Sequence, residues 1–197
     1  MISEPMTLAT DYLLAAVTAY LAIRILSLSE RQNARRWWGI AFVALALGAA
    51  LGGTYHGFEV EALWKPTIWS VGLASFAMVV GTAFATTTTA GRSSLIALAA
   101  LKLAAFWLWT GSDDRFIWVV ADTGGAFVLV AALHVWRWGE AGSRWILAGV
   151  GVSIAAAAVQ ASGLDLHRHF NHNDLYHLIQ IAAMAAYYRG VRQMRDR

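Results

Sequence analysis

The sequence contains no cysteine and few charged residues. Without cysteine, the chain forms no disulfide, no thioether bond to haem and no thiolate metal site. Any metal must therefore be bound by histidine, aspartate or glutamate. Charged residues make up only 14% of the 197 positions and hydrophobic ones 58%, which is too apolar for a soluble domain. We predict an integral membrane protein with a single transmembrane domain, residues 1–197.

Several sequence patterns are missing as well. No stretch alternates apolar and polar residues with the period of a strand, so strands are not predicted. The chain has no internal repeat, nucleotide-binding loop, Gly-x-Ser-x-Gly elbow or His-Glu-x-x-His motif. Alanine, leucine and other small residues fill the apolar segments instead, which favours closely packed helices. The predicted fold class is therefore all-α.

Apolar segments separated by short polar connections run along the whole chain. Each is long enough to cross a bilayer of about 30 Å as a helix of about 20 residues. The segments cover residues 8–28, 37–55, 67–88, 93–110, 116–138, 144–163 and 172–190. Short connections place consecutive helices antiparallel, so we predict a bundle of seven transmembrane helices.

Lysine and arginine are distributed unevenly between the two sides of this bundle. If the N-terminus is outside, the outer loops hold Lys65, Arg115 and Arg168. The cytoplasmic side then holds ten basic residues: Arg31, Arg35, Arg36, Arg92, Arg137, Arg144, Arg189, Arg192, Arg195 and Arg197. This bias predicts an N-out, C-in protein of a bacterial inner (cytoplasmic) membrane. Because the membrane accounts for the basic residues, no nucleic-acid partner is expected.

Histidines gather where the last apolar segment begins. Residues 167–177 hold four of the six histidines, and an apolar run follows at once. Ionisable groups at such a position are costly to leave unpaired, so a partner is expected. The predicted topology places His56 at the same depth, with Asp11 nearby. Lys102, inside another span, is expected to snorkel or to pair, and His134 to lie at the interface.

A metal site follows from these positions. His56, His172 and His177 form a three-histidine set with an open fourth position, which is the pattern of a catalytic zinc. Asp122, Asp174 or Asp11 is the expected general base or orienting carboxylate, with Asp122 and Asp174 favoured. The alternative is that the histidines are interfacial and bonded to loop carbonyls.

The spacing of the two late histidines restricts this site. His172 and His177 are five residues apart, or about 140° around an ideal helix. His172 therefore joins the site only if the first turn is not yet helical, with Asn171 or Asn173 as a cap, or if a π-bulge shifts the register.

A known family combines these features. Seven spans, the histidine of Thr54-Tyr55-His56 ending span two, and His172 and His177 opening span seven resemble the CREST group of membrane hydrolases. That group includes alkaline ceramidases, progestin and adiponectin receptors and haemolysin III-like proteins. The resemblance implies zinc held by span-two and span-seven histidines, an assisting aspartate and serine, and hydrolysis of a lipid amide or ester. The N-out orientation is similar to that of the ceramidase branch.

The sequence departs from this family in two places. Members usually open span seven with His-x-x-x-His, where this chain has Asn173 in place of the first histidine. They carry an aspartate early in span three, where this chain has Lys65-Pro66-Thr67. Asp122 or Asp174 is the expected substitute.

Two other function classes remain open. A bundle of this kind can hold haem between two axial histidines, here His56 and His177. It can also relay protons or carry a small solute, here through Asp11, Asp122 and His177. The leading expectation is a zinc-dependent hydrolase with a membrane lipid as substrate.

Overall fold

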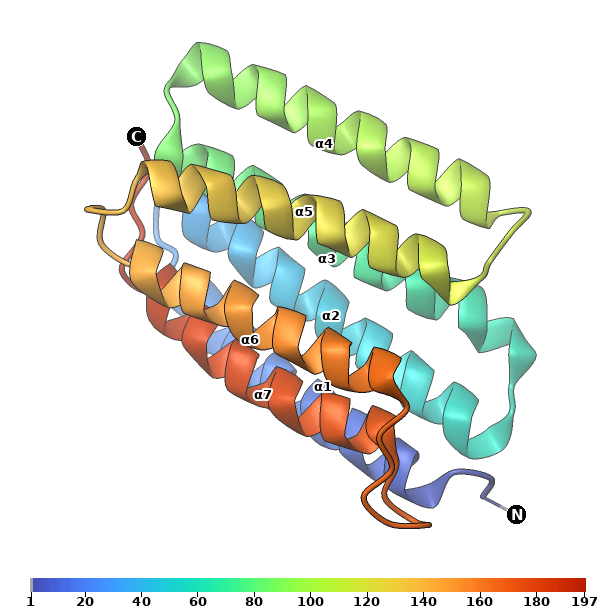
Figure 1. Ribbon diagram of the computed structural model, residues 1–197. Coiled ribbons are helices and arrows are strands. Elements are labelled where there is room, and N and C mark those ends of the chain that lie inside the picture. The colour runs from blue at the N-terminus through green and yellow to red at the C-terminus, as the bar shows by residue number, and fades with distance from the viewer. Residues whose placement is uncertain (1) are drawn as a thin grey trace.

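The computed structural model describes residues 2–197. In this range the chain forms seven α-helices and a short 3-10 turn, η1 (Glu61–Leu63). The helices are α1 (Pro5–Ser27), α2 (Asn33–Phe58), α3 (Trp64–Thr86), α4 (Thr89–Thr110), α5 (Phe116–Trp136), α6 (Ser143–Ser162) and α7 (His172–Val191). Consecutive helices run in opposite directions, so the two chain ends lie at opposite ends of the bundle (Figure 1). We call these the N-terminal end and the C-terminal end.

The predicted all-α class is confirmed, and each predicted segment corresponds to one helix. Among residues 2–197, six helices are long and apolar enough to cross a membrane, α7 not being one of them. Its sequence lowers the hydropathy because it carries His172, Asp174, His177 and Gln180. Asp174, His177 and Gln180 are all buried. These features are consistent with a multi-pass membrane protein whose most polar helix turns its polar groups inward.

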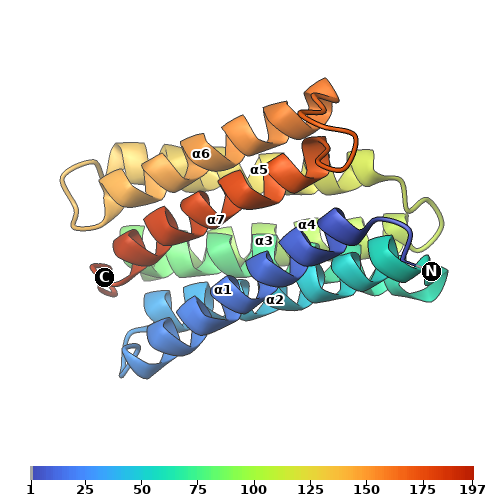
Figure 2. The same ribbon diagram turned by 90° about the horizontal axis from the view of Figure 1, so that it is seen from below.

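Within the described chain, six helices form a closed ring and α4 lies outside it. The ring runs α1, α2, α3, α5, α6 and α7, and α7 packs back on α1. α4 packs mainly on α3 (Figure 1), and only Ala99, Phe106 and Thr110 among its residues are buried. Seen from below, α1 and α7 lie side by side along much of their length (Figure 2).

The largest buried side chains lie in the half of the ring nearer the C-terminal end. Trp38 of α2 and Tyr187 of α7 are each 1% exposed, with ring centroids 5.4 Å apart. A Cβ atom at Gly149 of α6 would lie 2.5 Å from the Tyr187 ring, so glycine is required for this approach. Trp38 and Tyr187 therefore form the aromatic part of the core in this half.

Candidate functional site

A group of buried polar side chains in the ring centres on His177, one and a half turns into α7. Its Nε2 atom lies 3.1 Å from Oδ1 of Asp11, on α1. Its Nδ1 atom lies 3.1 Å from the Thr10 hydroxyl, also on α1. The Asp11 and His177 side chains are 6% and 8% exposed. Two neighbouring residues of α1 thus hold both nitrogens of a buried imidazole.

Asp174 fixes the other side of this arrangement. Its Oδ2 atom accepts a hydrogen bond from the backbone N–H of Asn171 at 2.8 Å, while the Asn171 side chain accepts from the N–H groups of Asn173 and Asp174. This is a capping box, with Asn171, one of the two caps considered for this helix, at the N-cap position. The other oxygen, Oδ1, lies 3.4 Å from the Thr10 hydroxyl. Asp174 therefore orients both the first turn of α7 and the group that holds His177.

Two glycines on α2 leave space for the Asp11 side chain. A Cβ atom at Gly53 would lie 2.8 Å from the Cβ of Asp11, closer than side chains tolerate. At Gly52 the same atom would lie 3.9 Å from Oδ2 of Asp11. The pair of glycines allows α1 and α2 to approach closely, which directs the Asp11 carboxylate into the ring and toward α7.

Two carboxylate oxygens near this point are buried and lack a hydrogen-bond partner among residues 2–197: Oδ2 of Asp11 and Oε2 of Glu4. Nδ1 of His56 lies 3.7 Å from that same Glu4 oxygen. We call Glu4, Asp11, His56, Asp174 and His177, together with Thr10, the α1–α7 cluster.

The Asp11–His177 contact depends on which ring nitrogen of His177 carries the proton. If the Thr10 hydroxyl donates to Nδ1, then Nε2–H donates to the Asp11 carboxylate and no further charge is needed. The Thr10 hydroxyl can donate or accept, and it also lies 3.0 Å from the carbonyl oxygen of Met6. When it donates to that oxygen, it accepts from Nδ1–H, and Nε2 presents a lone pair to the Asp11 carboxylate. Two electron-pair donors 3.1 Å apart then need a proton or a cation between them. Tetrahedral ligands at 2.0–2.1 Å from zinc are separated by about 3.3 Å, close to this spacing.

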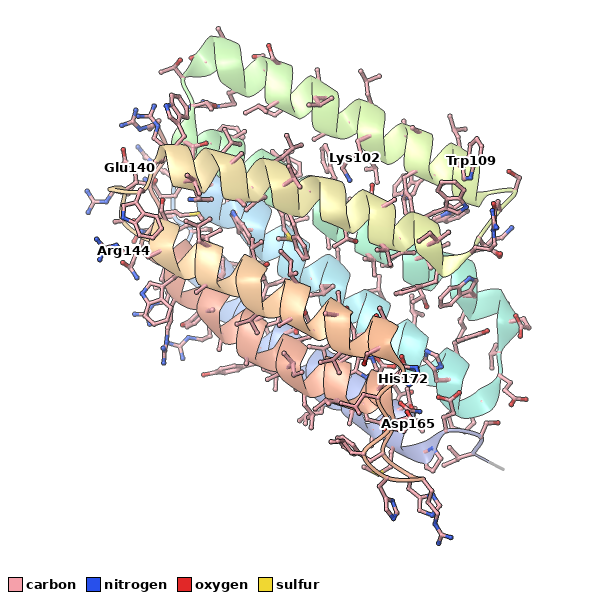
Figure 3. The ribbon with its side chains drawn as sticks, in the orientation of Figure 1. Lys102, Trp109, Glu140, Arg144, Asp165 and His172 are labelled. Carbon is pink, nitrogen blue, oxygen red and sulfur yellow. The ribbon has the colours of Figure 1, made fainter. Side chains whose placement is uncertain are left out.

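The structure does not bring His172 to this cluster. Its Nδ1 atom and its backbone N–H contact Oδ1 of Asp165, at 2.9 and 3.1 Å. Both residues lie at the N-terminal end of the bundle, next to the loop before α7 (Figure 3). These hydrogen bonds hold the pKa of the exposed Asp165 carboxyl below its ordinary value, because they favour its charged form. α7 is helical from His172 onward, so the ring points away from His177 as the spacing implies.

Asp122 has a different partner from the one expected. Its carboxylate forms an ion pair with Lys102 of α4, whose ammonium also donates to the Asp122 carbonyl oxygen at 3.1 Å. The Ser75 hydroxyl of α3 lies 3.4 Å from the ammonium. Lys102 therefore pairs rather than snorkels, and the pair fastens the peripheral α4 to the ring. A catalytic role for Asp122 stays a prediction.

Residues 2–197 contain no group of three or more histidine, aspartate or glutamate side chains already placed around one ion. The sequence places Asp11, His56 and His177 at one depth and leaves Asp11 as one of three carboxylates that could orient a histidine, without singling it out as the partner of His177. Thr10 and Glu4 were not predicted. Thr10 directly precedes Asp11 in the sequence, and both are buried. This adjacency was the one sequence feature that could have pointed to Thr10.

Comparison with known proteins adds a family. A family of unknown function, DUF6962, matches residues 6–196, which include every member of the cluster except Glu4. No curated protein and no solved structure matches the chain. Since the match runs through all seven helices, the chain belongs to the DUF6962 family.

Proposed function

We propose that this protein is a zinc-dependent intramembrane hydrolase acting on a lipid amide or ester. The observation that carries the proposal is the buried contact between Asp11 and His177, with the second Asp11 oxygen left without a hydrogen-bond partner in residues 2–197. A charged group is costly in such surroundings unless a cation or a proton neutralises it. The resemblance to the CREST hydrolases supports the same chemistry.

His56, His177 and Asp11 are the ligands we assign to the zinc ion. Two imidazoles and one carboxylate with an open fourth position are a donor set that catalytic zinc uses. Asp11 thereby takes the place predicted for His172, whose ring is engaged by Asp165. Zinc bound there supplies a Lewis acid that makes water a nucleophile at neutral pH.

The other cluster residues have supporting roles. Asp174, through the Thr10 hydroxyl, holds the His177 ring in one orientation, as outer hydrogen bonds do for metal-binding histidines. Asp174 is therefore a positioning residue. Glu4, with its free oxygen 3.7 Å from His56, is the group placed to accept a proton from water entering at the N-terminal end.

The depth of the cluster suits a lipid linkage. Asp11 lies six residues into α1 and His177 five residues into α7, so both are about 8–9 Å below the helix ends. We infer seven spans with the N-terminus outside and the C-terminus in the cytoplasm of a bacterial cell, from the lysine and arginine bias. The cluster would then face ester and amide groups of the outer leaflet.

Hydrolysis of fluorogenic ceramide and ester lipids by the purified protein tests the function. We expect wild-type activity to be abolished by a chelator and restored by zinc. Asp11→Asn and His177→Gln should lower the rate about a thousandfold, because each removes a ligand of the catalytic ion. His169→Gln, a histidine change in the exposed loop, is the matched control and should keep the rate. Wild-type protein that is inactive on both lipid classes with zinc present would contradict the proposal.

A second candidate, a proton relay, is favoured by polar groups that continue from the cluster along α7. The Gln180 amide donates to the Ser153 hydroxyl at 3.2 Å, and that hydroxyl lies 3.3 Å from the hydroxyl of Tyr187. In this reading Asp11 and His177 share a proton in place of zinc. Proton flux into liposomes that is lost in Gln180→Leu, with lipid hydrolysis absent, would select it. The haem alternative is tested by a visible absorption band.

A further inference from the structure

A polar cavity of about 510 Å³ lies at the C-terminal end of the bundle, at the far end from the α1–α7 cluster. The ends of α2, α3, α5 and α6 and the chain that follows α7 contribute its lining. Four arginines line it: Arg35, Arg192, Arg195 and Arg197. The last three are exposed, so they stand where the cavity opens to solvent.

The opposite wall holds a buried histidine with an unused nitrogen. His134, in the last turn of α5, is 1% exposed, and its Nδ1 atom lies 3.0 Å from the Ser143 hydroxyl. Its Nε2 atom has no hydrogen-bond partner among residues 2–197. A buried polar atom without a partner costs free energy, and His134 belongs to the lining of the cavity.

The two carboxylates of the lining neutralise only part of the charge of the four arginines. Asp196 accepts hydrogen bonds from the backbone N–H groups of Asn33 and Ala34, at 2.8 and 2.7 Å, and so caps α2. Glu140 accepts from Arg197 at 2.7 Å. One carboxylate is therefore committed to a helix terminus and the other to a single arginine, and the cavity keeps a positive excess.

We propose that this cavity binds a phosphate group, carried by a lipid headgroup or by a soluble molecule. Guanidinium groups form paired hydrogen bonds with phosphate and with carboxylate oxygens. A phosphate group carries up to two negative charges, so several arginines around one cavity favour it over a singly charged carboxylate or a neutral group. The Nε2 atom of His134 and the Ser143 hydroxyl supply neutral contacts at the closed side. The volume suits a phosphorylated small molecule or headgroup more than a bare ion, since ligand cavities span about 300–1,000 Å³.

Binding measurements on the full-length protein in detergent and in nanodiscs test this assignment. The probes are inorganic phosphate, measured by calorimetry, and phosphatidic acid in phosphatidylcholine nanodiscs, counted by native mass spectrometry. Arg195→Gln removes an exposed arginine, and His134→Phe keeps the ring volume without its nitrogens. Each should weaken binding about tenfold, as loss of one hydrogen bond to a charged group does.

Arg144→Gln is the matched control. Arg144 lies at the same end of the bundle (Figure 3), stacked 5.6 Å from the Trp138 ring, and does not belong to the cavity lining. Binding of phosphatidic acid but not of inorganic phosphate assigns the cavity to a headgroup, and the reverse assigns it to a soluble ligand. Binding of neither probe, or an equal loss in Arg144→Gln and Arg195→Gln, overturns the proposal. If His134→Phe does not fold, the comparison of Arg195→Gln with Arg144→Gln tests phosphate binding by itself.

Discussion

The ion pair between Lys102 and Asp122 gives a prediction whose size follows from burial. Their side chains are 20% and 3% exposed, and both lie within helices long and apolar enough to cross a membrane. Lys102→Met leaves the Asp122 carboxylate buried without its cation. Breaking a buried pair on one side costs about 3–5 kcal/mol of unfolding free energy. For a chain of this size that corresponds to a melting temperature lower by roughly 6–20 °C.

The double variant separates burial of a charge from loss of packing. Lys102→Met combined with Asp122→Leu replaces both charges by apolar groups, which is often neutral for a buried pair. We expect it to recover most of the lost stability in detergent, measured by tryptophan fluorescence during heating. Lys65→Met is the control, because within the described chain the Lys65 ammonium forms no ion pair and donates to the Gly111 carbonyl oxygen at the end of the bundle. Additive losses in the double variant, or a cost below about 1 kcal/mol for Lys102→Met, would refute the reasoning.

The remaining predictions concern three other contacts. Gly53→Ala places a methyl group 2.8 Å from the Asp11 Cβ. The free energy of unfolding should therefore fall by about 1–3 kcal/mol, and the zinc content should fall with it. A variant with wild-type zinc content and stability would refute the tight approach of α1 and α2. Asp196→Ala uncaps α2 and should cost about 1–2 kcal/mol, seen in chemical unfolding, whereas an unchanged midpoint would mean that the cap is dispensable. His172→Ala should keep zinc and activity while the pKa of Asp165 rises toward its ordinary value in NMR titration; the stability from that bond is present at neutral pH and lost as pH falls through the folded pKa. Loss of zinc in His172→Ala would show that His172 is a zinc ligand, as the three-histidine hypothesis predicts.

The helices could be predicted because each depends on local composition. The segment predicted over residues 116–138 forms a helix at Phe116–Trp136, and that over 172–190 forms one at His172–Val191. The differences lie at the ends, where caps such as Asn171 decide the first residue.

The partners within the site could be predicted only in part. Depth along a helix follows from residue number, so Asp11, His56 and His177 could be placed at one level. The direction of each side chain depends on helix rotation and on which helices become neighbours, and neither follows from hydropathy. For that reason the sequence did not predict that Asp122 pairs with Lys102 or that His172 pairs with Asp165.

Zinc content of the purified protein tests the central assignment most directly. After dialysis against zinc-free buffer, elemental analysis of wild-type protein should find one zinc per chain, and Asp11→Asn and His177→Gln should find none while keeping the wild-type helical circular dichroism. Wild-type protein without stoichiometric zinc, or the same zinc content in both variants, would contradict the account of Asp11 and His177 as ligands of one ion.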